Sequence, residues 1–345
     1  MLSFIQTTMS PAGYHGPRED YSPGLPFFEG WYFKLVDARE ATRLAVIPGV
    51  FHALNPLESH AFIQVLDGAS GKVSYHQYPL EEFQAAKSGF DIQIGPNHFS
   101  QRGIRLDIAD AQRSLRGELR FHDPLPSPWP VTPLSPGIMG WYAWVPFMEC
   151  YHGVVSFNHG LDGQLSLDDQ ACDLTGGRGY IEKDWGRSFP SAWIWTQTNH
   201  FQHAGTCLTA SIAIIPWLGN AFPGFIVGLW HNNQLHRFAT YTGARTRVLE
   251  ISTDQVRWEV RNRSHTLEMI ASRAQGGLLI APTPSGMDRR IAETLDARVS
   301  VCLSERSSRG SQVIFQDEGR NAGLEAAGDL DRLRRMLFHE SQPAL

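Results

Sequence analysis

The sequence predicts an all-β protein of two antiparallel, barrel-like halves with few short helices. Short runs of apolar and β-branched residues recur at close intervals, separated by Gly, Asp-Gly and Ser-Gly turns, as in an antiparallel barrel or sandwich. The same rhythm appears on both sides of a proline-rich stretch, and a single short segment shows clear helical spacing. We therefore expect an N-terminal domain at residues 1–178 and a C-terminal domain at residues 179–345. The pattern by itself does not separate barrels from sandwiches.

Strands are expected throughout the first half, after a loop-rich start at residues 1–26 that is punctuated by prolines. Leu80–Ala86 could form one or two helical turns. Residues 123–138 are so rich in proline that they exclude a regular element, so they form a linker or a long surface loop. The expected strands of this half are Gly30–Val36, Thr42–Pro48, His60–Leu66, Lys72–Pro79, Phe90–Ile94, His98–Ser100, Ile104–Ala109 and Ser114–Phe121.

The second half repeats this rhythm and ends in the one strong helix signal. Leu330–Phe338 carries Leu330, Leu333 and Leu337 at helical spacing, which predicts a short amphipathic helix. The expected strands from residue 153 on, apart from the segment treated below, are Gly153–Asn158, Gly163–Leu167, Cys207–Ile215, Phe225–His231, Gln234–Tyr241, Arg245–Ile251, Gln255–Arg261, Thr266–Ser272 and Ala297–Leu303.

Composition excludes several classes of protein. The 345 residues are 42% hydrophobic and 19% charged, which is typical of a folded globular chain. A formal net charge of −5 without a basic stripe argues against nucleic-acid binding. The four cysteines are far apart and form no C-x-x-C pair, so we expect neither a disulfide framework nor a zinc knuckle: Cys150, Cys172, Cys207 and Cys302.

No targeting segment or membrane span is evident. The N-terminus lacks a basic region followed by an apolar core, so we expect no signal peptide. The most apolar later run, 212–230, is interrupted by Pro216, Asn220 and Pro223, which excludes a membrane-spanning helix. We expect a soluble cytoplasmic protein, which a lipophilic substrate would draw into peripheral contact with a membrane.

Residues 176–201 concentrate the side chains that indicate a binding or catalytic site. If 180–185 is a strand, Glu182 and Asp184 lie on one face, and Lys183 and Trp185 lie on the other. After a corner at 186–190, a second strand would place aromatic and amide groups on one face, which suits a ligand cavity: Trp193, Trp195, Gln197 and Asn199. The alternative is that the tryptophans fill a barrel core while the polar groups satisfy buried backbone.

Three carboxylates could serve as a general acid. Glu182 and Asp184 on one strand face would lie about 7 Å apart, and their repulsion would favour a retained proton. Lys183 and Arg187 could instead form an ion-pair cluster with them. Glu29 lies two residues before Trp31 on another expected strand, and an apolar cavity would raise the pKa of its carboxyl group. A salt bridge to a cation is the alternative for Glu29.

Cofactor and metal motifs are missing from the sequence. It contains no G-x-S-x-G, H-E-x-x-H or Walker loop, and the glycines at 176–179 precede a strand, so they are no dinucleotide fingerprint. We expect catalysis without a bound cofactor. Histidines in or beside strands could ligate a metal, but no spacing requires it, and we expect none. His152 is the histidine that we expect in the cavity.

Three segments resemble the tocopherol cyclase family. The family's E-K-x-W-G…F-P…W-x-W-x-Q-x-N pattern is similar to GYIEKDWGRSFPSAWIWTQTNHF at 179–201. Its N-terminal signature resembles FFEGWYFK at 27–34, and its bacterial members resemble MGWYAWVPFMECYHGVVSFNHGLDG at 139–163. Order and spacing agree over most of residues 11–330. Family members can carry another polar residue at the position of Asp184.

The resemblance implies tandem lipocalin-like barrels and ring closure on a prenylated phenol or quinol. An acid protonates a tail alkene, and the phenolic oxygen attacks the resulting cation to form a chromanol-type ring. The acid would be Asp184, Glu182 or Glu29, with Asp184 preferred. The residues expected to bind this lipophilic substrate are Trp31, Tyr32, His152, Trp185, Trp193, Trp195, Gln197 and Asn199.

Two other functions remain open at this point. A lipocalin-like barrel with the same aromatic lining could be a non-catalytic carrier of an isoprenoid or another lipophilic compound. An alkene hydratase would use the same acid, with water capturing the cation in place of a phenol. The carrier requires no protonated acid in the cavity, whereas both enzymes do.

Overall fold

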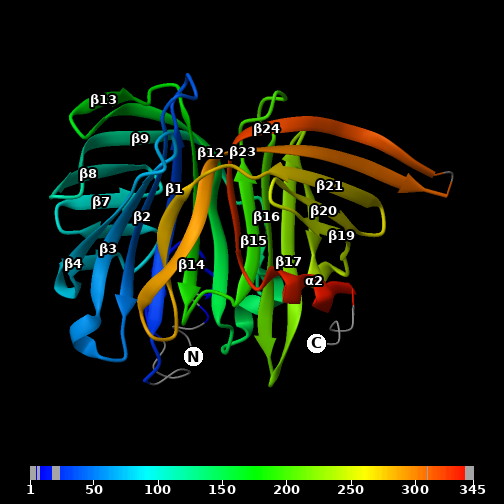
Figure 1. Cartoon of the computed structure of the whole chain (residues 1–345), viewed down its shortest axis with the longest axis horizontal. Coiled ribbons are helices and arrows are strands. Elements are labelled where there is room, and N and C mark those ends of the chain that lie inside the picture. Colours follow the sequence, from blue (N-terminus) through cyan, green and yellow to red (C-terminus); the bar gives the residue numbers. More distant parts are fainter. Residues whose placement is uncertain (1–4, 6–7, 18–23, 309, 339–345) are drawn as a thin grey trace. The chain divides into compact units, whose positions relative to one another are not determined.

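The computed structural model describes residues 5, 8–17, 24–308 and 310–338, and nearly all of its regular structure is antiparallel strand (Figure 1). The chain divides into two compact units. Unit 1 comprises residues 1–189 and 277–291, and unit 2 comprises residues 190–276 and 292–345. Each unit is a β-barrel half curved around its own apolar core. The all-β, two-barrel prediction is therefore confirmed.

Unit 1 is built on one antiparallel sheet with the strand order β4-β3-β2-β1-β14-β12-β9-β8-β7-β6-β5. β13 pairs with β12 beside this path. The strands are β1 (Phe27–Val36), β2 (Arg43–His52), β3 (His60–Asp67), β4 (Val73–Pro79), β5 (Phe83–Ala85), β6 (Asp91–Ile94), β7 (Asn97–Ser100), β8 (Gly103–Ala109), β9 (Ser114–Pro126), β12 (Cys150–Leu167), β13 (Gln170–Asp173) and β14 (Arg178–Gly186).

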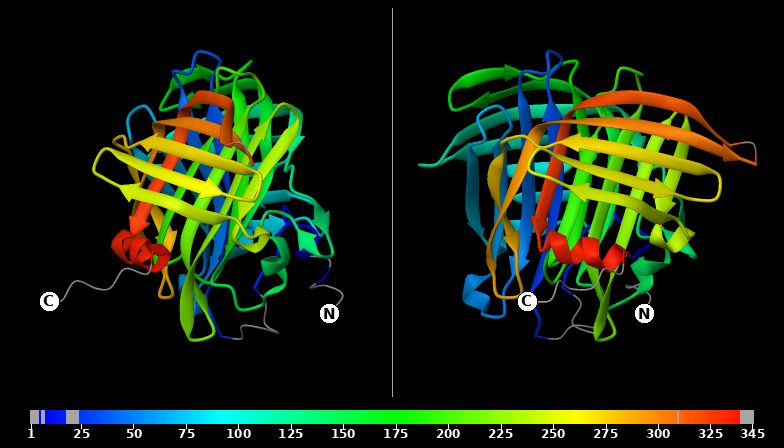
Figure 2. Two further views of the ribbon diagram at one scale, coloured as in Figure 1. Left: turned by 90° about the vertical axis from the view of Figure 1, so that its right-hand side faces the viewer. Right: turned by 45° about the vertical axis from the view of Figure 1, so that its right-hand side comes forward.

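Unit 2 is built on a second antiparallel sheet with the order β18-β17-β16-β15-β24-β23-β21-β20-β19. Figure 2 shows this sheet and the long hairpin of β23 and β24 from two further sides. The strands are β15 (Ala192–Thr198), β16 (Cys207–Trp217), β17 (Asn220–His231), β18 (Gln234–Ala239), β19 (Arg245–Ile251), β20 (Gln255–Arg261), β21 (His265–Ser272), β22 (Gly277–Pro282), β23 (Met287–Ser307) and β24 (Gly310–Gly328). β22 pairs with β23.

Short elements complete the described chain. The helix α2 (Leu330–Phe338) has the predicted bounds, and its Leu333 is buried in the core of unit 2. No helix in the described ranges is long and apolar enough to cross a membrane. The remaining elements are the strands β10 (Val131–Thr132) and β11 (Ser135–Pro136) and the 3-10 turns η1 (Pro56–Glu58), η2 (Leu80–Glu82), η3 (Gly140–Trp144) and η4 (Thr240–Thr242).

The division into units differs from the one that the sequence suggested at 178/179. β14 follows that position but pairs on both sides with strands of unit 1. β22 also belongs to unit 1, although it comes late in the chain. There the side-chain amide of Gln64 bonds both backbone groups of Ile280, at 3.2 Å and 2.6 Å, and so replaces part of a strand ladder.

Alternation along the strands decides which side chains enter each core. In β1, Trp31, Phe33 and Leu35 point into the core of unit 1. In β15, Ile194 points into the core of unit 2, whereas its neighbours Trp193 and Trp195 do not. Trp31, expected from the sequence to be among the substrate-binding residues, is instead fully buried in this core, where its indole stacks on the ring of Phe90.

Glycines permit the close approaches around β14. A side chain at Gly177 would collide with the carbonyl oxygen of Val36. A side chain at Gly179 would occupy the position of the buried His159 ring. At the end of the strand, Gly186 has a φ of 149° and lies against the backbone of β12. The glycine-rich entry thus lets β14 pack tightly between its two partner strands.

A buried ion pair joins β1 to β14 inside unit 1. Lys183 Nζ lies 2.6 Å from Glu29 Oε1, and neither side chain is exposed. The ammonium also donates to the carbonyl of Gly13, and it lies over the indoles of Trp31 and Trp185 at 5.0 Å and 4.7 Å. The pair is thus surrounded by aromatic rings and by the N-terminal segment.

The same carboxylate fixes the N-terminal segment. The backbone amide of His15 donates to Glu29 Oε1 at 2.8 Å, and that of Gly16 donates to Oε2 at 3.0 Å. Burial by itself would raise the pKa of Glu29, but Lys183 and His15 lower it to about 2. Glu29 is therefore a carboxylate at neutral pH.

The Lys183–Glu29 ion pair can be tested through its effect on stability. Glu29→Gln should lower the free energy of unfolding by roughly 3–5 kcal/mol, because it leaves the Lys183 charge buried without its partner. The double variant Glu29→Gln/Lys183→Met should recover part of this loss. Urea unfolding followed by tryptophan fluorescence measures all three proteins.

Asp107→Asn is the matched control, since the ion pair of Asp107 with Arg116 is exposed and its loss should cost at most about 1 kcal/mol.

The contribution of Glu29 to the free energy of unfolding depends on pH in a defined direction. The lowered pKa of Glu29 stabilises the fold above its ordinary value of 4.5, and this contribution disappears as pH falls toward 2. Equal stability of Glu29→Gln and wild type at pH 7 would contradict this account.

Candidate functional site

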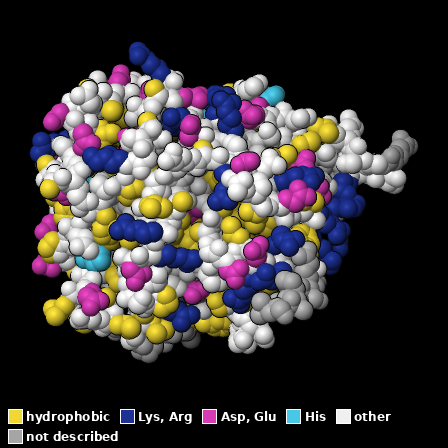
Figure 3. All heavy atoms as spheres, in the orientation of Figure 1, with side chains coloured by type: hydrophobic (Ala, Val, Ile, Leu, Met, Phe, Trp, Pro, Cys, Tyr) yellow, Lys and Arg dark blue, Asp and Glu magenta, His cyan; other side chains and the backbone are white. Residues whose placement is uncertain are grey.

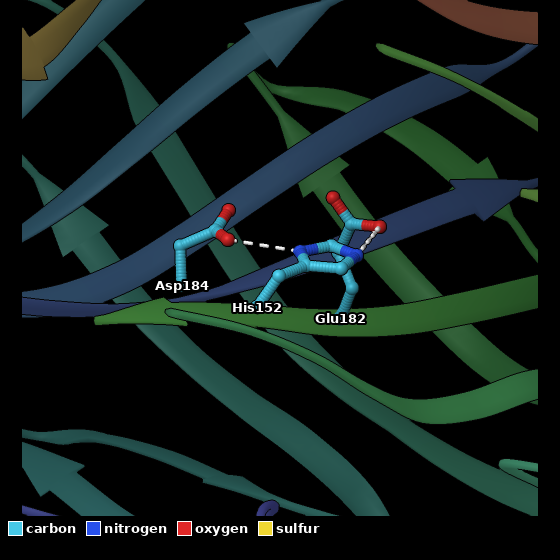
Figure 4. A group of neighbouring side chains, drawn as sticks. All are labelled: His152, Glu182 and Asp184. Carbon is cyan, nitrogen blue, oxygen red and sulfur yellow. Dashed lines mark hydrogen bonds and ion pairs between the residues drawn. The ribbon is translucent and has the colours of Figure 1, made fainter. Parts of the chain in front are cut away.

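The predicted pair of carboxylates lies on the face of β14 that points away from the core of unit 1. The register with β12 places His152 directly opposite Asp184 and Val154 opposite Glu182. Figure 4 shows the imidazole ring of His152 lying between the two carboxylates. Its Nδ1 is 2.9 Å from Asp184 Oδ1, and its Nε2 is 3.8 Å from Glu182 Oε2.

Electrostatics make this histidine a cation. Burial by itself lowers the pKa of His152, but the charges of Asp184 and Glu182 and the hydrogen bond to Asp184 raise it to about 9. At neutral pH the ring is therefore an imidazolium. The side chain of Asp184 is 28% exposed, so it is the member of the group that a substrate can reach most easily.

A tyrosine orders the other carboxylate. The hydroxyl of Tyr180 donates to Glu182 Oε2 at 2.6 Å, and both side chains are buried. Tyr32 of β1 is the cross-strand partner of Glu182, so its ring lies on the same face of the sheet. Next to it, Gly30 is the partner of Asp184 and leaves this carboxylate without a neighbouring side chain on β1.

The cation of this group differs from the expected ones. The alternative to a shared carboxylate proton was an ion-pair cluster with Lys183 and Arg187. Lys183 points to the opposite face, and the Arg187 guanidinium donates to the carbonyl of Phe147 at 2.9 Å. His152 provides the positive charge and the proton, because β12 brings it between the carboxylates.

Three other predicted residues lie on the opposite, core-facing side of the same sheet. Glu29, Trp31 and Trp185 belong to the buried Lys183 environment. The predicted rise in the pKa of Glu29 is wrong, since the adjacent ammonium favours the charged form. The ring of Trp185 stacks on that of His15, with 4.1 Å between centroids. These three side chains therefore do not join the His152 group.

The remaining predicted residues form a buried polar and aromatic face on unit 2. It consists of Trp193, Trp195, Gln197 and Asn199, which alternate with core residues as expected. The indole of Trp193 donates to Glu325 Oε2 at 2.6 Å. Whether these residues bind substrate stays a prediction.

Sequence reasoning missed two carboxylates on this face. Glu325 is the cross-strand partner of Trp195 on one side and of Glu293 on the other, and Glu293 is buried. A signal was present, since Glu325 is the one charged residue in the small-residue run NAGLEAAG at 321–328. Such an acid in a buried strand needs a polar partner.

The His152 group is also where a metal ion could be considered. In the described ranges, His152, Glu182 and Asp184 are the group whose ligand atoms lie within 4.8 Å of one another. The group therefore offers three protein ligand atoms, one from each residue, which is the number that catalytic zinc sites use. The expectation that no metal binds here stays a prediction.

Known proteins resemble this chain in sequence and in fold. Tocopherol cyclase of Zea mays is 28% identical over 203 residues, which cover 55% of this chain and 41% of the maize protein. The probable tocopherol cyclase of Oryza sativa subsp. japonica is 26% identical over 212 residues, which cover 57% of this chain and 44% of the rice protein. The match therefore spans less than half of either plant protein.

The likeness in fold extends further along the chain. The crystal structure of CghA with Sch210972 has a TM-score of 0.53 and 10% identity, and it covers 95% of this chain and 97% of that one. At this identity the likeness concerns the fold alone.

The family model described as tocopherol cyclase-like matches residues 126–328, which include the segments at 139–163 and 179–201 but not the one at 27–34. Since this match extends over more than half of the sequence, the chain belongs to the tocopherol cyclase-like family.

Proposed function

We propose that the chain is an acid–base enzyme that closes a chromanol-type ring on a prenylated phenol or quinol, with His152 and Asp184 as its proton source. The observation that carries this proposal is the ring of His152 held between two carboxylates, with its Nδ1 2.9 Å from Asp184 Oδ1. Family membership supports the reaction class. The substrate and the ring formed are part of the proposal.

The proposed reaction is an isomerisation in which atoms and charges balance. The proton of the imidazolium passes along the hydrogen bond to Asp184, and the carboxyl group transfers it to one carbon of the tail alkene. The other carbon becomes a tertiary cation, and the phenolic oxygen forms a C–O bond to it. The phenolic proton then returns through Asp184 to His152, so each turnover leaves the enzyme unchanged.

The cluster favours the cation that this reaction requires. Once the proton has left, the side chains of His152, Glu182 and Asp184 carry more negative charge than before, which attracts the carbocation nearby. The ring of Tyr32 on the same face offers a π surface, and such surfaces stabilise cations by about 0.5–2 kcal/mol. Glu182 holds the imidazolium in place, itself ordered by Tyr180.

Alkene hydration is the second candidate. It uses the same proton transfer, and water captures the cation in place of a phenol. The partial exposure of Asp184 favours it, because water can reach the carboxylate. A carrier without catalysis is the third outcome that experiments must separate, because a buried aromatic face such as that of Trp193 and Trp195 can also hold a ligand without transforming it.

Deuterium transfer tests the assigned acid. In D₂O the wild type should place one deuterium in each product molecule formed from a prenylated quinol. Asp184→Asn keeps the shape of the side chain but cannot carry the proton, so turnover should fall by roughly 10²–10⁴-fold. The turnover of His152→Gln should fall by a similar factor, and that of Glu182→Gln by a smaller one. Mass spectrometry of the product measures both rate and deuterium content.

Asp110→Asn is the matched control for this experiment. Asp110 forms a second carboxylate–histidine pair in unit 1, with His76 at 2.5 Å, and its loss should leave turnover unchanged. Full activity of Asp184→Asn would reject the acid assignment. A product that contains an added water molecule would identify the reaction as hydration and not cyclisation. Stoichiometric binding without turnover would favour the carrier.

The pH dependence provides a second test. His152 must be protonated, and its raised pKa keeps the proton until pH rises through about 9. Activity should therefore stay level from pH 7 to 8 and decline around pH 9. The residual activity of His152→Gln should lack this decline. A decline of wild-type activity already near pH 6.5, the ordinary value for histidine, would contradict the proposed role.

Ligand binding tests the aromatic face of unit 2. Titration with a prenylated quinol should quench tryptophan fluorescence, and Trp195→Ala should weaken binding by about tenfold or more, since a buried tryptophan contributes strongly to apolar contact. Trp217→Ala, which changes a tryptophan near the β16–β17 turn of the same unit, is the control. Equal affinities of Trp195→Ala and wild type would show that this face does not bind the ligand.

A further inference from the structure

One end of unit 1 exposes large apolar side chains on separate connections between strands. In the β2–β3 connection, Leu57 is 94% exposed and Leu54 is 61% exposed. Leu134, between β10 and β11, is 86% exposed, and Val131 of β10 and Leu25 before β1 are exposed as well. Scattered apolar residues on a surface need no explanation, but a group of them at one end indicates an interaction site.

The strand register places these connections at one end of the sheet. β2 ends beside the start of β1, where Phe27 pairs with His52. β12 begins there too, because its first residue and Phe28 both pair with Gly186. The β2–β3 connection and the long connection into β12 therefore leave the sheet at the same end. Figure 3 shows hydrophobic side chains at the lower left of this view, among others that are spread over the rest of the visible face.

The exposed apolar residues stand in stretches without charge, although Glu58 follows Leu57 in the β2–β3 connection. Residues 124–148, which form most of the path from β9 to β12, contain no Asp, Glu, Lys, Arg or His. Residues 53–57 are uncharged as well. The exposed side chains of these two stretches therefore offer no ionic complement to a protein or to an anionic surface. Its complement is an uncharged apolar phase.

We propose that this end of unit 1 inserts into the surface of an uncharged lipid layer from which the substrate enters. We call its five exposed side chains the apolar rim: Leu25, Leu54, Leu57, Val131 and Leu134. Contact of the apolar rim with lipid is inferred from the exposure of its side chains and the charge around them. That the substrate enters there rests on the proposed function, since a prenylated substrate resides in lipid.

The form of the rim favours a lipid surface over a protein partner. Its side chains stand on separate connections, so they can enter a fluid layer independently, whereas a protein would have to match each of them in shape. Beside them, Trp141 stacks on Tyr142 with 4.1 Å between ring centroids. Aromatic side chains of this kind gather at membrane–water interfaces because they are apolar with a polar tip.

Vesicle binding tests the proposal. The full chain should float with large unilamellar vesicles of phosphatidylcholine, and added salt should not change this binding. Leu54→Ser/Leu57→Ser should weaken the partition coefficient by about a hundredfold, which is about tenfold for each leucine. Leu134→Ser, in another connection, should weaken it by about tenfold.

Leu278→Ser is the matched control. This leucine is 57% exposed in unit 1, and it follows Gly277, which lies against the β3–β4 turn at the opposite end of the sheet. The variant should bind vesicles as the wild type does. Equal weakening by Leu278→Ser would overturn the proposal, and so would binding that needs anionic lipid and is lost in salt. A dimer in solution that Leu57→Ser abolishes would identify a second copy as the true partner.

The failure of this inference can be told apart from the failure of the proposed function. With a short-tailed, water-soluble substrate, the rim variants should keep wild-type turnover, whereas Asp184→Asn should bind vesicles normally without turnover. Loss of turnover of the soluble substrate in the rim variants would assign the rim to the reaction site and reject its role in lipid contact.

Discussion

Side chains along β14 point alternately to its two faces, and both the core and the candidate site depend on this alternation. This strand is paired on both sides, with β1 and with β12, so it cannot shift by one residue without exchanging its two faces. One face sends Lys183 into the core, and the other carries Glu182 and Asp184. Charged groups on both faces of an interior strand require partners on both sides.

Each face solves this problem with a different strand. β1 supplies Glu29, which neutralises Lys183 and fixes the N-terminal segment through its other hydrogen bonds. β12 supplies His152, which neutralises one of the two carboxylates. Two groups that are both largely buried therefore shift in opposite directions: the pKa of Glu29 falls and that of His152 rises. In both cases the neighbouring charge outweighs the cost of burial.

Local patterns were sufficient to predict the fold class, the faces of β14 and β15, and the helix at 330–338. Each of these depends on periodicity within a few residues. The partner of Asp184 could not be predicted in this way, because the β12–β14 register contains irregularities between Val154 and Ser156 and beyond. The same is true of the Lys183–Glu29 pair and of β22, whose partners in unit 1 are far away in the sequence. The proline-rich connection was predicted as irregular, but its exposed Leu134 became meaningful only when the register showed that it shares one end of the sheet with the β2–β3 connection.

The central claim is that His152 is an imidazolium held by Asp184 at neutral pH. Titration of ¹⁵N-labelled histidine by NMR, with the resonance assigned by comparison with His152→Gln, measures this most directly. The account predicts a pKa near 9 in the wild type and a clearly lower one in Asp184→Asn, because the main attractive charge is gone. A ring that titrates at or below 6.5 in the wild type would contradict it.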